Sequence, residues 1–264
     1  MDDRFDLNSL LYDDDEQPLE HFPAGGGYCR VFRSLGIVGD SLAAGEFETR
    51  QENGTPCYTD MYEYAWGAYL GRMAGIEIHN FSRGGMTAKE YLDTWAEENH
   101  FWDPALACQG YILALGDNDL FFHNVPTGTV EDAKCENPNT FAGQMMQIVR
   151  RYREIQPEAK FFFVTMPKWQ PVDEWEVKAE AHAVLLREMS SVIPNSYVID
   201  LRRYVPSFDA KFRERMFMFG HMNPLGYVYT ADVMAAYIDY LVRHHAAEFN
   251  MLGFMPHGTP TKLG

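Results

Sequence analysis

The chain has 264 residues, of which 46% are hydrophobic and 14% aromatic. This length and composition predict one folded domain with a substantial core and exclude a disordered chain. The 38 Asp and Glu residues outnumber the 22 Lys and Arg residues and give a formal net charge of −16. Because such a surface repels phosphate groups, we expect neither a nucleic-acid partner nor a membrane partner.

The ends of the chain and its cysteines indicate the expected location. The first six residues are acidic and lack the apolar core of a signal peptide. No apolar run approaches the roughly 18 residues of a transmembrane helix, so we expect a cytoplasmic protein. The four cysteines form no Cys-x-x-Cys motif and are expected to be free, mostly buried thiols. They are Cys29, Cys57, Cys108 and Cys135.

Three regions are predicted along the chain. Residues 1–33 contain an acidic run and a Gly/Pro-rich break, which predict an irregular lead-in that packs on the domain. Residues 34–248 are predicted to form the domain itself. Residues 249–264 are again rich in Gly and Pro and predict an irregular tail.

Within the domain, short apolar segments alternate with segments of helical periodicity. The apolar segments predict buried parallel strands over 35–38, 76–81, 111–115, 161–164 and 197–199. The periodic segments predict helices over 60–73, 87–95, 141–152, 173–189 and 224–242. Thr87 with Glu90 matches a capping box, and Asn223 before Pro224 is typical of a helix start. The alternation predicts an α/β fold, a three-layer α/β/α sandwich around a five-stranded parallel sheet.

Two stretches are candidates for lining a substrate. Residues 120–139 show no clear periodicity and contain Phe121, and connections of this length in compact domains are typically functional. Trp169 and Trp175 follow the fourth predicted strand. Their positions are equally consistent with two roles: lining a substrate pocket and covering the hydrophobic core.

The residues that follow the strands carry the chemistry. In open parallel sheets, ligands bind beyond the carboxyl ends of the strands. Ser41 leaves the first strand, and His221 precedes the last helix. A serine hydroxyl becomes a nucleophile when a base takes its proton, and histidine is the side chain suited to that role near neutral pH. The backbone N–H groups of Ser41 and Gly85 and the side-chain amide of Asn118 are candidate oxyanion donors.

Three neighbouring residues are expected to support these groups. Asp40 is predicted to accept backbone N–H bonds and brace the loop of the nucleophile, Asp119 to fix its own turn, and Asn223 to cap the last helix. Structural roles are the alternative for the catalytic candidates: Ser41 fits a helix N-cap, and Asn118 fits a turn. The histidines show no metal-ligand spacing, so no metal site is expected.

Four short motifs occur in an order along the chain that resembles the SGNH (GDSL-type) hydrolase family. They are Gly39-Asp40-Ser41-Leu42, the spacing Asn80…Gly85…Thr87, Gly116-Asp117-Asn118-Asp119, and His221 ahead of Asn223-Pro224. The resemblance implies a flavodoxin-like three-layer fold and esterase, lipase or carbohydrate-deacetylase activity on a small-molecule ester. It implies no metal and no cofactor.

The sequence departs from this family at one position. The family usually places an Asp three residues before the catalytic histidine, where this chain has Met218. Either Ser41 and His221 act as a dyad, with a backbone carbonyl orienting the ring, or an acid from elsewhere in the chain, such as Asp200 or Asp209, takes the role of the missing Asp.

Two functions therefore stay open at the level of the sequence. The first is a serine esterase that cleaves a small, soluble acyl ester, with an acetylated carbohydrate as one candidate, through an acyl-enzyme. The second is a non-catalytic protein of the same fold that binds a carbohydrate or an acyl group.

Overall fold

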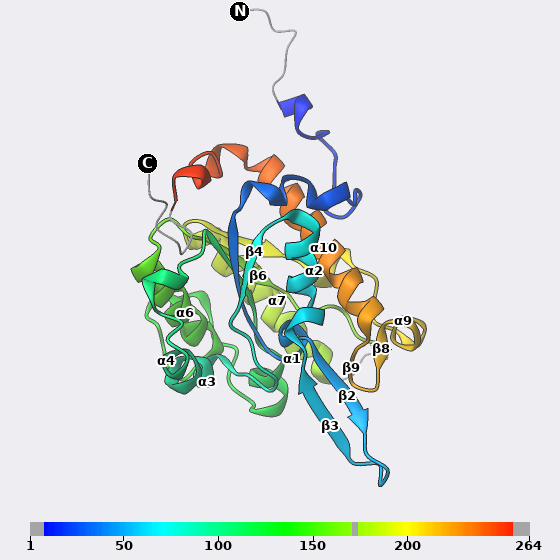
Figure 1. Ribbon diagram of the computed structural model, residues 1–264. Helices are drawn as coiled ribbons and strands as arrows, with labels where there is room; N and C mark the ends of the chain where they lie inside the picture. The colour runs from blue at the N-terminus through cyan, green and yellow to red at the C-terminus, as the bar shows by residue number, and fades with distance from the viewer. Residues whose placement is uncertain (1–7, 171–173, 256–264) are drawn as a thin grey trace, which may run out of the picture.

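In the computed structural model, which describes residues 8–170 and 174–255, a five-stranded parallel sheet forms the centre of the molecule (Figure 1). The strands, in their order across the sheet, are β4 (Glu77–Asn80), β1 (Ser34–Gly39), β5 (Gly110–Ala114), β6 (Lys160–Val164) and β7 (Ser196–Ile199). All five predicted strands are confirmed.

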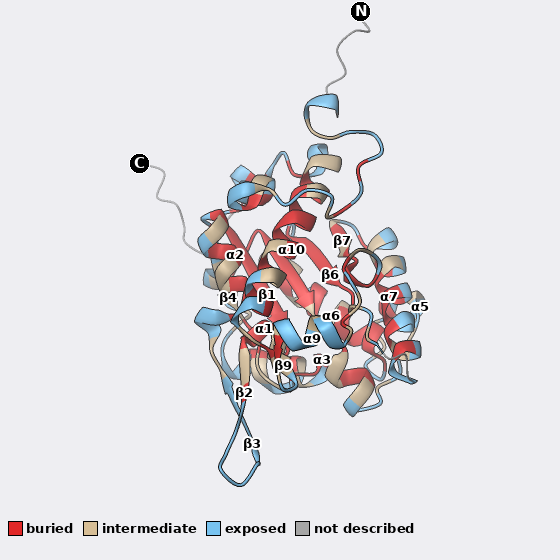
Figure 2. Ribbon diagram, turned by 90° about the vertical axis from the view of Figure 1, so that its right-hand side faces the viewer, coloured by how far each residue is buried: buried red, intermediate tan, exposed pale blue. Residues whose placement is uncertain are grey.

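Most of the sheet is buried on both faces, and its strands are mainly apolar (Figure 2). The edge strand β4 is the exception, because it contains Glu77, His79 and Asn80 and none of its residues is fully buried. Successive side chains of a strand point to opposite faces. On β6, Phe162 and Val164 join one hydrophobic cluster, while Phe161 and Phe163 join the other. Each cluster receives helices from its own side, so the predicted three-layer sandwich is confirmed.

Helices cover both faces of the sheet. The first cluster takes residues from α2 (Trp66–Ala74) and α10 (Pro224–His244). The second takes residues from α3 (Ala88–Glu90), α6 (Phe141–Ile155) and α7 (Glu174–Val192). The shorter helices are α1 (Ser41–Ala44), α4 (Ala96–Glu98), α5 (Val130–Lys134), α8 (Leu201–Tyr204) and α9 (Ala210–Met216).

The helix starts predicted at Thr87, Phe141 and Pro224 are confirmed, the one predicted at residue 60 is wrong, and the one predicted at residue 173 lies outside the described residues. Thr87 Oγ1 accepts a hydrogen bond from Glu90 N at 3.1 Å, and Asn223 Oδ1 accepts one from Gly226 N at 3.0 Å. The helix expected from residue 60 begins only at Trp66, because residues 56–60 are extended and a 3₁₀ turn precedes the helix.

An antiparallel hairpin that was not predicted projects from the body of the molecule (Figure 1). It consists of β2 (Glu46–Arg50) and β3 (Pro56–Asp60). Its turn contains Asn53-Gly54, with Gly54 in the left-handed region at φ 84°. Glycine adopts this conformation without the steric cost that a Cβ atom brings. A second, two-residue ladder joins β8 (Phe217–Met218) to β9 (His221–Met222).

The connection over 120–139 is more regular than its sequence indicates. It begins within a π-helical turn (Asn118–Phe122) and contains α5, whose N-terminus Thr129 caps in a capping box with Asp132. The absence of a clear period reflects the shortness of these elements, since one or two helical turns show too few positions to establish a repeat.

The lead-in is tied to the last helix. A 3₁₀ helix (Ala24–Val31) packs against α10 and α2. Further upstream, Glu16 accepts two hydrogen bonds of 2.6 Å from Arg243. At the other end, residues up to 255 form short 3₁₀ turns, Ala246–Glu248 and Leu252–Phe254.

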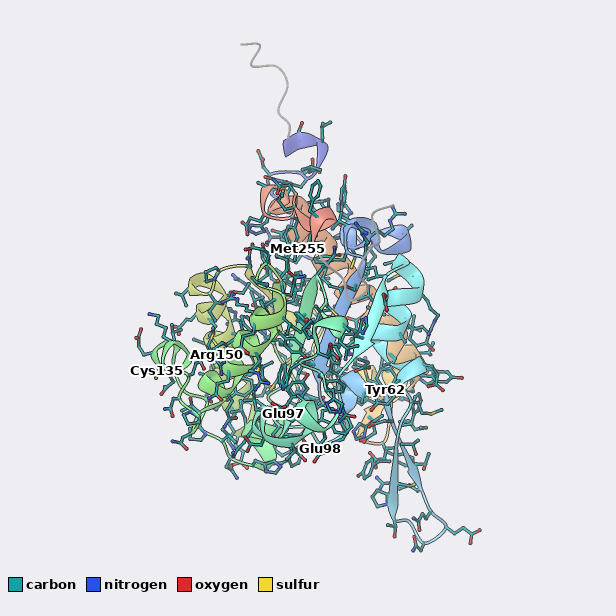
Figure 3. All side chains as sticks on the ribbon, turned by 60° about the vertical axis from the view of Figure 1, so that its left-hand side comes forward. Tyr62, Glu97, Glu98, Cys135, Arg150 and Met255 are labelled. Atoms are coloured by element: carbon teal, nitrogen blue, oxygen red, sulfur yellow. The ribbon has the colours of Figure 1, made fainter. Side chains whose placement is uncertain are left out.

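The prediction of mostly buried cysteines is half wrong. All four thiols are free, and Cys29 and Cys108 are buried. Cys57 lies on the exposed hairpin and Cys135 at the surface after α5 (Figure 3). Among the helices of the described ranges, none is long and apolar enough to span a bilayer.

Candidate active site

A cleft of about 730 Å³ lies beyond the carboxyl ends of the strands. Its walls include all four residues expected to carry the chemistry: Ser41, Gly85, Asn118 and His221. They come from the ends of β1, β4 and β5 and from β9, so the fold brings to one place residues that are distant in the sequence.

Ser41 is held at the junction of β1 and α1. It is the first residue of α1, and Asp40 is the N-cap, with its Oδ1 accepting a hydrogen bond from Leu42 N at 3.2 Å. Asp40 thus braces this loop as predicted. The Ser41 side chain is half-buried and faces the cleft.

The turn after β4 supplies the backbone of Gly85. This residue has φ 73°, and a Cβ at this position would meet no atom within 4 Å. Glycine is therefore required here by the backbone conformation and not by crowding. The preceding Gly84 N donates to Asp60 Oδ2 at 3.2 Å, which ties the turn to β3.

Asn118 and Asp119 connect the third motif to the segment after β4. Asn118 Nδ2 donates one hydrogen bond of 3.2 Å to Met86 O. An amide nitrogen carries two N–H groups, so one more is available for a ligand in the cleft. Asp119 is buried, and its Oδ1 accepts a hydrogen bond from Ala88 N at 2.9 Å. Asp119 therefore braces the start of α3 as well as its own loop.

His221 lies on β9, opposite Met218 in the ladder. The residues that contact its ring come from the unpredicted hairpin. Glu46 Oε1 lies 2.9 Å from Nε2, and Glu48 Oε2 lies 3.3 Å from Nδ1. The ring of Tyr58 on β3 meets the imidazole edge-on, with centroids 5.6 Å apart.

The acids suggested by the sequence lie elsewhere. Asp200 is buried and accepts hydrogen bonds from Thr165, Arg187 and the N-terminus of α8. Asp209 caps α9 through Phe212 N at 2.8 Å. Both carboxylates cap helices. Their positions in the sequence alone do not distinguish this structural role from a catalytic one. Asn223, also expected in support, caps α10 two residues after His221.

The electrostatics of the cleft are dominated by carboxyl groups. Burial of the imidazole lowers its pKa, but hydrogen bonding and charge from Glu46 and then Glu48 outweigh it, and the pKa of His221 is raised. Burial, together with the charges of Asp117 and Asp119, raises the pKa of Asp40. Burial is also the main cause that raises the pKa of Asp119 to about 6.

The hydroxyl and the imidazole face the same cleft without a direct bond. Within the part of the chain that the structure describes, no hydrogen bond joins Ser41 Oγ to His221, whose Nε2 is instead beside Glu46. Catalytic hydrogen bonds often form only when a substrate is bound.

An aromatic wall closes one side of the cleft. Phe121 stacks on Trp175 with ring centroids 4.8 Å apart and an interplanar angle of 10°. Trp169 also lines the cleft, and it packs edge-on against Phe208 and Phe217 of the core. Both tryptophans therefore line the cleft, and Trp169 covers the core as well.

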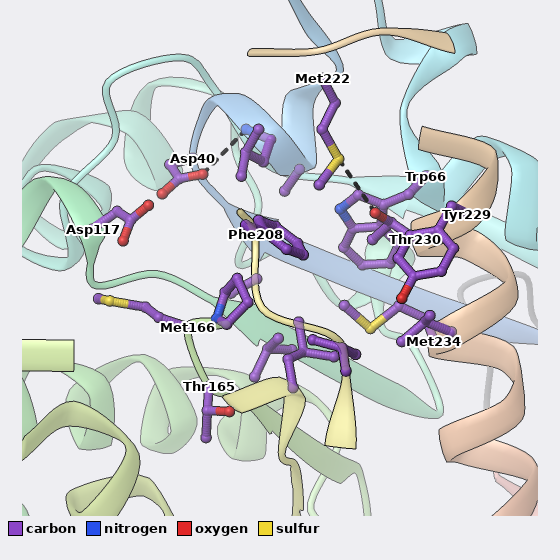
Figure 4. A pocket seen from close by; sticks show the side chains of 18 of the residues that line it. Asp40, Trp66, Asp117, Thr165, Met166, Phe208, Met222, Tyr229, Thr230 and Met234 are labelled. Carbon is purple, nitrogen blue, oxygen red and sulfur yellow. Dashed lines mark hydrogen bonds between the residues drawn. The ribbon is translucent and has the colours of Figure 1, made fainter. Parts of the chain in front are cut away.

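A second, mainly apolar cavity adjoins this cleft (Figure 4). The two share Asp40, Leu42 and Asp117, and the second extends toward Trp66 and Phe208. Ser41 lines only the first. Across 8–170 and 174–255, no group of three or more His, Cys, Asp or Glu side chains is placed to hold a metal ion.

Several solved structures share the fold of this chain. A possible lipase from Chitinophaga pinensis is 16% identical with a TM-score of 0.55, over 81% of this chain and 98% of that one. A carbohydrate esterase family 2 enzyme with a carbohydrate-binding domain from Corynascus thermopiles is 13% identical with a TM-score of 0.56, over 80% and 66% of the two chains. The family 3 carbohydrate esterase of Clostridium thermocellum is 15% identical with a TM-score of 0.50, over 80% and 97%.

The comparison with curated proteins found no match. The model of the GDSL-like lipase/acylhydrolase family, in contrast, matches residues 37–229, which include the end of β1, the other four strands of the sheet and the cleft residues from Ser41 to His221. The chain belongs to the GDSL-like lipase/acylhydrolase family of hydrolases.

Proposed function

We propose that the protein is a serine esterase in which Ser41 is the nucleophile and His221 the base. The observation that carries this proposal is that Ser41, Gly85, Asn118 and His221 line one cleft. Each comes from a different loop at the carboxyl edge of the sheet. The fold itself does not require a serine, a histidine and unused N–H donors to lie together at this edge.

The reaction follows from the chemistry of these groups. Neutral His221 accepts the Ser41 Oγ proton at Nε2 as the oxygen attacks the ester carbonyl. The N–H groups of Ser41 and Gly85 and the Asn118 amide stabilise the negative oxygen of the tetrahedral intermediate. His221 then returns its proton to the leaving alcohol, which breaks the ester bond and leaves an acyl group on Ser41. Water, deprotonated by His221 in the same way, releases the acid.

A small, neutral acyl ester fits the cleft best, and an acetylated carbohydrate is the first candidate. The stacked Phe121–Trp175 pair presents aromatic surface to the cleft, which favours apolar faces such as those of a sugar ring. The carboxylates of Glu46, Glu48 and Glu176 also line it and disfavour an anionic substrate. The carbohydrate esterases with the same fold support this substrate class.

The test compares p-nitrophenyl acetate and glucose pentaacetate as substrates of the wild type and of Ser41→Ala. The exposed Ser191→Ala on α7 is the matched control. We expect Ser41→Ala to lower kcat/KM by roughly 10³–10⁶-fold, because no other group supplies the nucleophile. Ser191→Ala should equal the wild type.

A non-catalytic binding protein is the second candidate, and the Glu46 contact at Nε2 is the observation in its favour. Hydrolysis at the background rate by the wild type, together with saturable binding of the acetylated sugar, would establish it in place of the esterase.

A further inference from the structure

The histidine of this cleft lacks the usual acid on its own loop. A base that accepts a proton at Nε2 must carry its own proton at Nδ1, and an acceptor at Nδ1 fixes that tautomer and stabilises the cation that forms. Met218, opposite His221 in the β8–β9 ladder, offers only a weak thioether acceptor.

Glu48 occupies the place at Nδ1. Its Oε2 lies 3.3 Å from His221 Nδ1 and also accepts a hydrogen bond of 2.8 Å from Gly220 N, the residue before the histidine. The other oxygen pairs with Arg50 at 2.5 Å. Arg50 in turn lies over the ring of Phe219, 4.7 Å from its centroid. Glu48 is therefore fixed on both oxygens.

Burial makes this carboxylate different from a surface ion pair. Glu48 is 4% exposed, although it lies on a hairpin that is otherwise largely exposed. A buried carboxylate is costly unless it is paired and hydrogen-bonded. Here its partners are the loop of His221 and Arg50, and these contacts offset the cost of burying the carboxylate.

We propose that Glu48 is the positioning residue of His221 and takes the role of the missing acid; this inference rests on the proposed esterase function. Glu48 accepts the Nδ1–H hydrogen bond while Nε2 takes the proton from Ser41 and later delivers it to the leaving alcohol. The acid thus reaches the site from the segment after the nucleophile, on β2.

Glu46 is the competing candidate because it contacts the other ring nitrogen. Its Oε1 lies 2.9 Å from Nε2, the atom that must face Ser41 during the reaction. A carboxylate there holds a protonated ring and competes with the serine. The two glutamates of β2 are thus expected to have opposite effects on turnover.

The experiment measures kcat, KM and the melting temperature with p-nitrophenyl acetate for Glu48→Gln, Glu48→Ala and the double variant Glu48→Ala/Met218→Asp. Glu52→Gln, at the exposed tip of the same hairpin, is the control. We expect Glu48→Gln and Glu48→Ala to lower kcat by about 10²–10⁴-fold with KM changed by less than about threefold. Because residue 218 faces His221 in the ladder, Met218→Asp should restore at least about tenfold of kcat in the Glu48→Ala background.

Three results would overturn the inference: wild-type kcat in Glu48→Gln, a loss that Met218→Asp does not repair, or a larger loss of kcat in Glu46→Gln than in Glu48→Gln. Ser41→Ala, measured alongside, separates these from failure of the proposed function. An active Ser41→Ala enzyme would refute the esterase mechanism itself, whereas an inactive one with an active Glu48→Gln enzyme refutes only the role of Glu48.

Discussion

At the scale of single residues, the imidazole of His221 is surrounded by acids. Glu46 and Glu48 contact it from β2, and Tyr58 covers its edge. The charge of His221 in turn favours the ionised forms of Asp60 on β3 and Asp40 before α1. Glu46 and Glu48 favour the imidazolium over the neutral ring, so the pKa of the proposed base is raised and the ring stays protonated to a higher pH than an isolated histidine.

This arrangement predicts the pH dependence of the activity. The proposed mechanism requires neutral His221, so kcat/KM should rise with pH as the ring loses its proton, and the raised pKa places this rise above the usual range for histidine. Glu46→Gln removes a charge at Nε2 and should move the rise to lower pH without lowering kcat on the alkaline side. A pH profile of kcat/KM for both proteins checks this. An unchanged profile in Glu46→Gln would contradict it.

The proposed nucleophile and base carry a signal in the sequence, but the proposed acid does not. Ser41 and His221 stand in short motifs next to an apolar strand and a capped helix, which are local signals. Glu48 has no such signal: it is one of many glutamates, and only the docking of β2 on the loop before His221 selects it. Asp200 and Asp209 were candidates for the acid because of their positions in the sequence, yet each side chain caps a helix.

At the scale of elements, the hairpin is the part that periodicity missed. Its strands have the sequences EFETR and PCYTD, with few apolar residues, because most of the hairpin faces solvent and only Glu48 is fully buried. The pattern of a buried strand is therefore absent. Asn53-Gly54 between the two segments is the available signal, since this dipeptide is typical of hairpin turns.

The buried strands of the sheet were predictable for the opposite reason. β1, β5, β6 and β7 are covered on both faces, so each includes a short continuous apolar run that is visible in the sequence. The edge strand β4 is only partly buried, and alternation marks it instead. Helix starts were predictable where a capping side chain marks them, as at Thr87 and Asn223. The start of α2 has no capping side chain, because Ala65 occupies the N-cap, and the boundary was misplaced.

Two turns with glycine in the left-handed region provide a matched test of the oxyanion donor. Gly85 (φ 73°) lines the cleft and Gly54 (φ 84°) lies at the hairpin tip, and at neither would a Cβ meet an atom within 4 Å. Alanine at each should therefore cost a similar ~1–2 kcal/mol of stability through backbone strain. Only Gly85→Ala should also lower kcat, by about 10-fold or more, because it displaces the N–H donor.

Thermal melts and kcat for both variants check this prediction. Equal kcat in Gly85→Ala and Gly54→Ala, at similar melting temperatures, would remove Gly85 from the oxyanion site.

At the scale of the whole molecule, a buried ion pair helps to attach the lead-in to the domain. The Arg243 side chain, 11% exposed, binds Glu16, Asp239 and Leu11 O, and so links α10 to a segment that precedes the sheet. Arg243→Ala or Glu16→Ala would each leave a buried charge with fewer partners, and such a loss is strongly destabilising.

Glu16→Ala should lower the free energy of unfolding by about 2–4 kcal/mol, and the melting temperature by several degrees, while kcat is unchanged because Glu16 lies outside the cleft. Asp14→Ala, an exposed acid of the same segment, is the control and should melt like the wild type. If both variants melt alike, the lead-in contributes nothing through this pair.

The central claim is that Ser41 is a hydroxyl activated by His221. Its most direct test is labelling of the full chain with a fluorophosphonate, which reacts with activated serines, followed by mass spectrometry of the peptides. We predict a single adduct on Ser41, which is absent in Ser41→Ala and greatly slowed in His221→Ala. No adduct on the wild type, or an adduct on another residue that persists in Ser41→Ala, would contradict the claim.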